Sequence, residues 1–308
     1  MRSVLLAAAL VAAAYAKTGI MLPLYEYPFG DAATVDWDAV VSAAAAHPQL
    51  DFYIIINDNS GPPYSPNPPA AIKDFAPYLG SLNSHDNVKL IGYIATGYGK
   101  KTATEVEAAV DQYTEWATAE GWAAGVSHDI HMDGIFFDEI DTAPSQLDHN
   151  TQISQYAKTK FAASGGPVVL NPGTFVQSGS ESLFDAADVI LDIEACYTNS
   201  SGRMDFNGYA CDPSASGFSA FTPATLEKLG SNPTYVSKSS VVVHDFYESW
   251  NPYEPASEAT LQTYVNAIIA KGVHSFYISQ LGYLGNFTAE PASISNVAKL
   301  AAAAQGLS

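Results

Sequence analysis

The sequence predicts an α/β protein built as a single-domain (β/α)8 TIM barrel, and three observations support this prediction. First, 47% of the 308 residues are hydrophobic and 15% are charged, so the chain is able to bury a large core. Second, eight short apolar runs alternate with helix-like segments. Third, the starts of these runs are spaced about 37 residues apart, which suits one βα unit each.

The eight apolar runs predict strands that are covered on both faces. In the run that ends with Ile54-Ile55-Ile56, apolar residues follow one another without alternation, as in parallel sheets. The predicted strands are residues 19–25, 52–57, 88–96, 134–138, 168–171, 189–194, 241–245 and 275–280. Ala-rich or amphipathic stretches predict helices at residues 103–119, 153–163, 261–271 and 294–304. An open doubly wound sheet is disfavoured, because no glycine-rich phosphate-binding turn follows the first strand.

Residues 1–16 have the pattern of a secretory signal peptide. A positively charged start, Met1-Arg2, precedes an apolar run of small residues, and Ala14-Tyr15-Ala16 resembles a cleavage site. The apolar run is shorter than the stretch of about 20 residues that spans a bilayer. We therefore expect a secreted protein, extracellular or associated with the cell wall, whose barrel domain comprises residues 17–308 and binds no membrane.

Charge and cysteine content agree with export. The chain has 32 Asp and Glu residues against 13 Lys and Arg residues, a net charge of −19, which is the opposite of what a nucleic-acid partner requires. The two cysteines, Cys196 and Cys211, favour a disulfide over two free thiols in an oxidising compartment. Asn199 and Asn286 begin triplets that match the N-glycosylation pattern.

Polar and aromatic residues lie at or near almost every predicted strand end. In a TIM barrel the carboxyl ends of the strands form the functional face, and unpaired polar groups are poor core material. We therefore expect these side chains to bind a ligand, and the aromatic ones to suit sugar faces, although packing is the commoner role of an aromatic residue. The predicted binding residues are Tyr25, Asn57, Tyr93, Thr96, Tyr98, Asn171, Tyr197, His244 and Gln280.

Carboxylates end the fourth and sixth predicted strands, namely Asp138 with Glu139, and Glu194 in the segment Asp192-Ile193-Glu194. Hydrolysis of a glycosidic bond needs one carboxyl group to protonate the leaving oxygen and another to attack or stabilise the anomeric carbon. Structural ion pairs and calcium or magnesium binding are the alternatives, and the small number of Lys and Arg residues weakens the first. We expect neither a metal nor a cofactor.

The expected roles are Asp138 as nucleophile or charge stabiliser, Glu194 as general acid/base, and Glu139 as a neighbour that orients substrate or tunes Asp138. Successive strand residues point to opposite faces, so Asp138 and Glu139 both face the pore only if the strand end is twisted or bulged. For two carboxylates on these strands we expect retention of anomeric configuration.

Five segments that begin at Pro23, Ile56, Ile91, Asp133 and Asn171 form a recognisable series. They read Pro-Leu-Tyr, Ile-Asn-Asp-Asn-Ser-Gly-Pro, Ile-Gly-Tyr-Ile-Ala-Thr, Asp-Gly-Ile-Phe-Phe-Asp-Glu and Asn-Pro-Gly. In this order they resemble the spherulin-4 family, grouped as glycoside hydrolase family 135, over essentially the whole chain after residue 16. The resemblance implies a (β/α)8 barrel that hydrolyses α-1,4-linked galactosaminogalactan, a polymer of galactose, N-acetylgalactosamine and galactosamine.

The resemblance also places the family's adjacent acids at Asp138 and Glu139 and its later acid at Glu194. The second segment departs from the family's usual Asn-Pro-x-Ser-Gly-Pro-Gly, since it carries Asp58 and Pro63. This departure bears on substrate range more than on catalysis.

The expected function is therefore a secreted, monomeric glycoside hydrolase of the endo-α-1,4-N-acetylgalactosaminidase type. A partly deacetylated polymer is cationic, so the acidic chain is expected to attract it, with Glu26, Asp58, Asp141 and Asp245 near the binding face. The alternative from another class is a non-catalytic carbohydrate-binding or developmental matrix protein on the same barrel. A divalent-metal hydrolase is weakened by the lack of an HExxH pattern.

Overall fold

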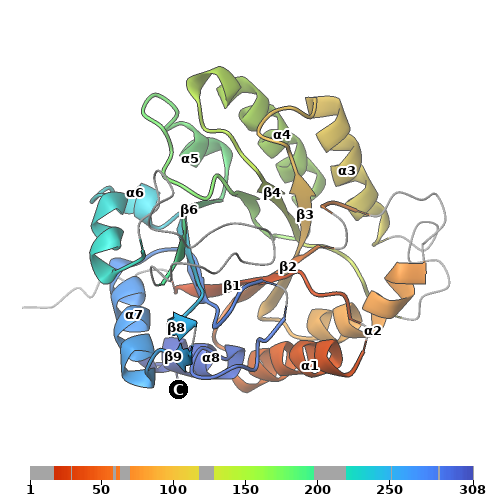
Figure 1. The fold of residues 1–308 in the computed structure, drawn as a ribbon. Helices are drawn as coiled ribbons and strands as arrows, with labels where there is room; N and C mark the ends of the chain where they lie inside the picture. The colour runs from red at the N-terminus through yellow and green to blue at the C-terminus, as the bar shows by residue number, and fades with distance from the viewer. Residues whose placement is uncertain are drawn as a thin grey trace, which may run out of the picture.

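The computed structural model of the protein describes residues 17–28, 30–57, 60–62, 70–117, 128–197, 220–250, 252–283 and 285–307. Within these residues, eight parallel strands close into one barrel in the order β1-β10-β7-β6-β5-β4-β3-β2. The helices lie around the outside of this barrel (Figure 1). The predicted single-domain TIM barrel is confirmed.

Each of the eight apolar runs forms one barrel strand. Their bounds are β1 Gly19–Leu24, β2 Phe52–Ile56, β3 Val88–Ala95, β4 Gly134–Asp138, β5 Val168–Leu170, β6 Val189–Cys196, β7 Ser239–His244 and β10 Ser275–Ile278. Every residue of β1, β5, β7 and β10 is buried, which is why these strands read as unbroken apolar runs.

The described helices are α1 Asp31–Ala46, α2 Ala70–Asn83, α3 Ala103–Glu115, α4 Leu147–Lys160, α5 Leu183–Ala186, α6 Pro233–Val236, α7 Glu258–Lys271 and α8 Ile294–Ala304. Two 3-10 helices, Pro144–Gln146 and Pro223–Leu229, precede α4 and α6. The bounds of α8 match the prediction, whereas α4 starts at Leu147 instead of residue 153. Its first turns are polar, so apolar periodicity alone does not reveal them.

Side-chain caps account for the starts of α3 and α7. Thr102 accepts the N–H of Glu105, and the Glu105 carboxylate accepts the N–H of Thr102, a complete capping box. At α7 the Ser257 side chain accepts the N–H of Thr260. These caps place the start of α7 at Glu258, three residues before the predicted helix at 261.

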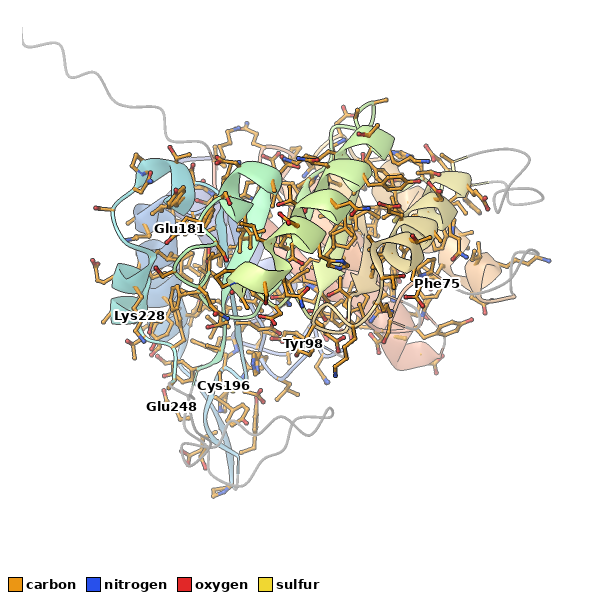
Figure 2. The ribbon with its side chains drawn as sticks, turned by 90° about the horizontal axis from the view of Figure 1, so that it is seen from above. Phe75, Tyr98, Glu181, Cys196, Lys228 and Glu248 are labelled. Carbon is orange, nitrogen blue, oxygen red and sulfur yellow. The ribbon has the colours of Figure 1, made fainter. Side chains whose placement is uncertain are left out.

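A two-stranded antiparallel hairpin, β8 Tyr247–Trp250 and β9 Tyr253–Pro255, lies between β7 and α7. The eight-unit prediction does not include it. Figure 2 shows the hairpin projecting on the side of the barrel where Cys196 ends β6 and Tyr98 follows β3. The hairpin therefore extends the face that the strand ends form.

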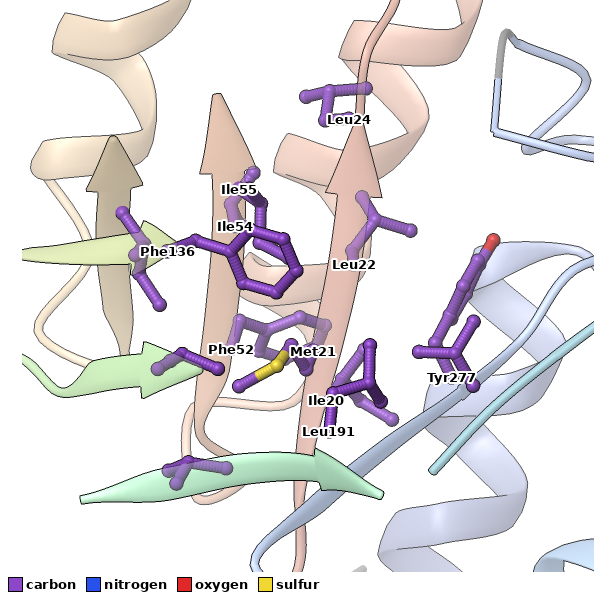
Figure 3. Packing of buried hydrophobic residues seen from close by; sticks show 14 of the residues in the cluster. Ile20, Met21, Leu22, Leu24, Phe52, Ile54, Ile55, Phe136, Leu191 and Tyr277 are labelled. Carbon is purple, nitrogen blue, oxygen red and sulfur yellow. The ribbon is translucent and has the colours of Figure 1, made fainter. Parts of the chain in front are cut away.

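Apolar side chains from strands that are not neighbours pack together in the core. Figure 3 shows Phe136 of β4 and Leu191 of β6 near Met21 of β1, and the strand registers put these three residues on the same face of the barrel wall. Burying each such side chain contributes about 1.5–3 kcal/mol relative to exposure. This filling makes the barrel a rigid support for the side chains at the strand ends. Among the described residues, no helix is both long and apolar enough to cross a membrane.

Asp133 joins the starts of β3 and β4, at the opposite end of the barrel. Its Oδ1 accepts a hydrogen bond from Lys89 Nζ at 3.0 Å, and its Oδ2 accepts one from the Leu90 N–H at 2.9 Å. Asp133 Oδ1 also lies 3.6 Å from His131 Nε2. Burial raises the pKa of Asp133, but hydrogen bonds from His131, Lys89 and Leu90 hold it below the ordinary value. Asp133 therefore has a structural role and is not part of the strand-end site.

We predict that Asp133→Ala lowers the free energy of unfolding by about 2 kcal/mol, because it leaves the buried Leu90 N–H without its acceptor. Asp129→Ala is the matched control, since Asp129 is 66% exposed although it too contacts His131. We expect the control to change stability by about 0.5 kcal/mol or less. Urea unfolding measures both variants, and equal losses would contradict this role for Asp133.

The stability lost in Asp133→Ala is also expected to depend on pH. Hydrogen bonding to Asp133 raises the pKa of His131 to about 9. A raised histidine pKa stabilises the fold fully below the unfolded pKa of about 6.5, and this contribution disappears as pH rises through about 9. The difference in stability between wild type and Asp133→Ala is therefore expected to shrink between these two pH values.

Candidate active site

The parallel barrel brings the ends of its strands to one face, and three successive strands there carry the central polar groups. Asp138 ends β4, Asn171 follows β5, and Glu194 lies near the end of β6. In the barrel, β4 pairs with β5 and β5 with β6. Asn171 is therefore placed between the two predicted catalytic carboxylates.

The Asn171 amide joins the two carboxylates directly. Its Nδ2 donates to Asp138 Oδ1 at 2.7 Å and to Glu194 Oε2 at 3.0 Å. Because both contacts share one nitrogen, the two oxygens lie no more than 5.7 Å apart, the sum of the two distances. Asn171 Oδ1 accepts the N–H of Gly173, whose left-handed φ of 63° suits glycine. Sequence reasoning assigned Asn171 to substrate binding, but its amide atoms are engaged inside the site.

A β-bulge in β6 turns Glu194 toward the same face as the interior residue Leu191. Leu191 pairs with Ser240 and Glu194 with Val242, two residues of β7 that share a face, and the register shifts between Leu191 and Ile193. Strict alternation would have placed Leu191 and Glu194 on opposite faces. The bulge is thus the local feature that brings Glu194 beside Asp138.

Asp192 is the extra residue of this bulge and does not join Glu194. It is 3% exposed, and burial raises its pKa to about 7, while hydrogen bonds from Ser239 and the Val176 backbone act in the opposite direction. The Asp192-Ile193-Glu194 segment therefore contributes one carboxylate to the site.

Asp138 accepts hydrogen bonds on both of its oxygens. Tyr93 OH donates to Oδ2, and the Glu139 N–H donates to Oδ1 at 2.8 Å, in addition to Asn171. Burial, followed by the charge of Glu194, raises the pKa of Asp138 to about 6, against the lowering effect of Tyr93 and Glu139 N–H. At neutral pH this carboxylate is ionised and fully oriented by donors.

Glu139 lies beside Asp138 but turns out of the strand. Its backbone has a left-handed φ of 56°, and its Oε2 accepts the Gly97 N–H at 3.1 Å. Thr96 Oγ1 donates to the carbonyl oxygens of Asp138 and Glu139 at 2.9 and 2.8 Å, and Tyr98 N–H donates to Glu139 O at 2.7 Å. The Thr96 hydroxyl, predicted to bind substrate, thus holds the backbone turn that separates the two acids.

Three tyrosines lie around the carboxylate pair. The rings of Tyr25 and Tyr93 meet edge to face with centroids 5.3 Å apart, and those of Tyr25 and Tyr283 are 6.1 Å apart. Burial, then the charge of Asp138, raises the pKa of Tyr25 and of Tyr93 well above 10, so both hydroxyls stay protonated. Sequence reasoning missed Tyr283; its position shortly after the eighth predicted strand was the available signal.

Gln280 does not match its predicted role. It is fully buried, its Nε2 donates to Phe246 O at 2.7 Å and Tyr253 OH at 2.8 Å, and its Oε1 accepts the Ala292 N–H at 3.1 Å. These contacts tie β10 to the β8–β9 hairpin and to the residues before α8. Gln280 is a structural link between loops, which corrects the prediction of a substrate-binding side chain.

The other predicted binding residues occupy different parts of the face. Tyr98 is 50% exposed beside Glu139. Asn57 Oδ1 accepts the Ser60 N–H at 2.8 Å. Tyr197 OH donates to Glu248 Oε1 of the hairpin at 2.6 Å. Among these three residues, Tyr98 presents the most open surface.

His244 is the last residue of β7 and contacts two residues of types that ligate metals, Asp245 and Cys196. Its Nδ1 lies 2.6 Å from Asp245 Oδ2, and its Nε2 lies 3.8 Å from Cys196 Sγ. Within the described residues, these three form a group with ligand atoms within 4.8 Å of one another. The predicted disulfide would occupy the sulfur and remove the thiolate that a soft metal prefers. The donor set then fits a metal poorly.

Several predictions concern residues outside the described part of the chain. Cys211, Asn199, Asp58 and residues 1–16 fall there, so the disulfide, one glycosylation site and the signal peptide stay predictions. Asn286 is described and exposed, as is Thr288, whereas Phe287 between them is buried. The Asn286 side chain is therefore accessible to a modifying enzyme.

Comparison with known proteins places the chain in a family. The spherulation-specific family 4 matches residues 19–301. Spherulin-4 of Physarum polycephalum is 29% identical over 201 residues, which are 64% of this chain and 50% of that protein, so the chain spans half the length of this relative.

Among solved structures, Sph3 of Aspergillus clavatus, determined in complex with GalNAc, is similar with a TM-score of 0.68 and 23% identity, over 93% of this chain and 98% of that one. The PgaB (BpsB) glycoside hydrolase domain of Bordetella bronchiseptica matches with a TM-score of 0.50 and 10% identity, over 85% and 93% of the two chains. Both agree with the barrel fold. On the match to residues 19–301, the chain belongs to the spherulation-specific family 4.

Proposed function

We propose that the protein is a secreted endo-acting glycoside hydrolase that cleaves α-1,4-linked galactosamine and N-acetylgalactosamine polysaccharide. The observation that carries this proposal is the pair Asp138 and Glu194, held within 5.7 Å by the Asn171 amide. Retaining glycosidases have carboxyl groups about 5 to 5.5 Å apart, and inverting ones about 6.5 to 9.5 Å. The family membership and the GalNAc complex of Sph3 support the choice of sugar.

In the proposed reaction, Glu194 donates its proton to the glycosidic oxygen while Asp138 Oδ attacks the anomeric carbon. The bond from that carbon to the leaving oxygen breaks, and a glycosyl ester on Asp138 forms. Glu194, now ionised, takes a proton from water, which attacks the same carbon and releases Asp138. The hydrogen bonds from Tyr93, Asn171 and the Glu139 N–H support Asp138 as the nucleophile, because they orient its ionised form.

We predict that Asp138→Asn and Glu194→Gln each lower kcat by about a thousandfold or more, with the fold intact, because each removes a group that acts in the bond-breaking step. Glu107→Gln is the matched control: Glu107 is a partly exposed carboxylate on α3 that accepts a hydrogen bond from Gln152 Nε2 at 2.9 Å. The assay sizes the products released from galactosaminogalactan by mass spectrometry. Near-full activity in either site variant would refute the assignment.

A wild-type protein that binds the polymer without shortening it would instead favour the non-catalytic carbohydrate-binding alternative. Chitosan serves as the comparison substrate, because it shares the amine but differs in the sugar and the linkage.

In the pH profile of kcat/KM, we expect the fall on the acid side, the acid limb, near pH 6. Burial and the Glu194 charge raise the pKa of Asp138 to about 6, and a protonated Asp138 cannot attack, so kcat/KM falls below this pH. Tyr93→Phe removes a donor to the ionised carboxylate and is expected to move this limb to higher pH. An acid limb that stays in place in Tyr93→Phe would show that it does not report Asp138.

We further propose that the acidic chain steers a cationic, partly deacetylated polymer. Three of the four carboxylates expected to contact ammonium groups are engaged internally. Burial, then Asp36, raises the pKa of Glu26 to about 7, Asp245 contacts His244 at 2.6 Å, and Asp141 accepts the Ala143 N–H at 2.9 Å. The proposal therefore rests on long-range attraction by the net charge of −19 more than on single subsites.

Steering predicts that kcat/KM for a deacetylated polymer falls as ionic strength rises, because salt shortens the Debye length from about 30 Å at 0.01 M to about 8 Å at 0.15 M. A fully N-acetylated oligomer is the matched control and is expected to respond little. The same salt dependence for both substrates would eliminate steering.

A further inference from the structure

Tyr283 has a buried hydroxyl that the proposed reaction does not yet use. It lies in the connection between β10 and α8, and its oxygen has no partner at hydrogen-bonding geometry among the described residues. A buried hydroxyl without a full hydrogen bond destabilises a folded protein, so such a group calls for an explanation.

Two aromatic neighbours fix the position of the Tyr283 ring. Its ring packs edge to face against His244, with centroids 5.2 Å apart at 62°, and against Tyr25 at 6.1 Å and 64°. His244 is the last residue of β7 and is itself held by Asp245. The ring is thus held between Tyr25, directly after β1, and His244, at the end of β7.

The charged group that acts most on this hydroxyl is Glu194. Glu194 pairs with Val242, which lies on the same face of β7 as His244, the ring on which Tyr283 packs. Burial, followed by the charge of Glu194 and by the approach of its carboxylate as a hydrogen-bond partner, raises the pKa of Tyr283 well above its ordinary value, with smaller effects from Tyr25 and Asp245. The phenol therefore stays protonated and is able to act as a donor toward the carboxylate. Asn171 already occupies Glu194 Oε2 at 3.0 Å.

We propose that Tyr283 is a positioning residue whose hydroxyl donates a hydrogen bond to Glu194 after Glu194 has released its proton to the leaving group. This inference rests on the proposed function, because it assigns Glu194 the role of general acid/base. A hydrogen bond that strengthens as the carboxylate becomes charged stabilises the transition state more than the bound substrate, and so raises kcat. It also orients Glu194 for the second step, when the carboxylate accepts a proton from water.

Other groups near Glu194 do not replace this donor. Asp138 and Asp245 are carboxylates, which accept hydrogen bonds when ionised and so do not donate to Glu194. His244 directs Nδ1 to Asp245 and Nε2 toward Cys196. Asn171 is shared with Asp138, so its amide does not distinguish the two ionisation states of Glu194 as a dedicated donor would.

The test compares Tyr283→Phe with Tyr277→Phe. Both variants remove one buried phenol hydroxyl that lacks a partner at full hydrogen-bonding geometry among the described residues. Tyr277 lies within β10, and the charged group that acts on its hydroxyl is Asp36, not Glu194. We expect Tyr283→Phe to lower kcat by about tenfold or more with little change in KM, because the variant loses a hydrogen bond to a group that becomes charged in the transition state. Tyr277→Phe is expected to leave kcat unchanged.

The alkaline limb of the pH profile gives the readout that a packing role would not move. Loss of a donor to the ionised carboxylate raises the pKa of Glu194, so the limb is expected to shift up by about one pH unit in Tyr283→Phe. A fall in kcat with an unmoved limb would overturn the proposal and leave Tyr283 with a packing role only.

A 13C NMR titration of the Glu194 carboxyl, assigned by loss of its signal in Glu194→Gln, makes the test independent of turnover. A higher Glu194 pKa in Tyr283→Phe than in wild type and Tyr277→Phe supports the proposal, and an unchanged pKa overturns it. If the wild-type protein cleaves no polymer, the proposed function fails, while this titration still decides whether Tyr283 donates to Glu194.

Discussion

The hydrogen bonds that Asn171 gives to Asp138 and Glu194 are the contacts on which the rest of the site depends. Two unit charges no more than 5.7 Å apart repel by at least about 3 kcal/mol at an effective dielectric of about 20. The shared amide, the Tyr93 hydroxyl and the Glu139 N–H supply positive dipoles that offset this repulsion. The remaining repulsion and the burial appear as the raised pKa of Asp138.

The barrel makes this arrangement possible because it fixes the order of three neighbouring strands. Asn171 lies between the carboxylates because β5 lies between β4 and β6. Two local departures from regular strand geometry complete the site. The bulge in β6 aims Glu194 inward, and the left-handed Glu139 turns the chain after Asp138, so that adjacent acids take separate positions. Such departures are common next to active sites, where they redirect single side chains.

The fold was predictable because each barrel strand is buried on both faces and leaves an unbroken apolar run, as in Phe52–Ile56. The central acids were predictable because parallel strands deliver Asp138 and Glu194 to the same end of the barrel. The bulge at Asp192 was not predictable, because one extra residue changes which side chains face inward and leaves no pattern in the sequence. The structural role of Gln280 depends on Phe246 and Ala292, which only the folded loops bring to it.

The central claim is that Asp138 and Glu194 act as a closely spaced, retaining pair, and the anomeric form of the first product tests it most directly. Proton NMR of an α-linked N-acetylgalactosamine oligomer during the first minutes of hydrolysis resolves the α- and β-anomers before they interconvert. Retention predicts that the α-anomer appears first, because two displacements at the same carbon restore its configuration. If the β-anomer appears first, a single displacement by water takes place and the proposed nucleophilic role of Asp138 is contradicted.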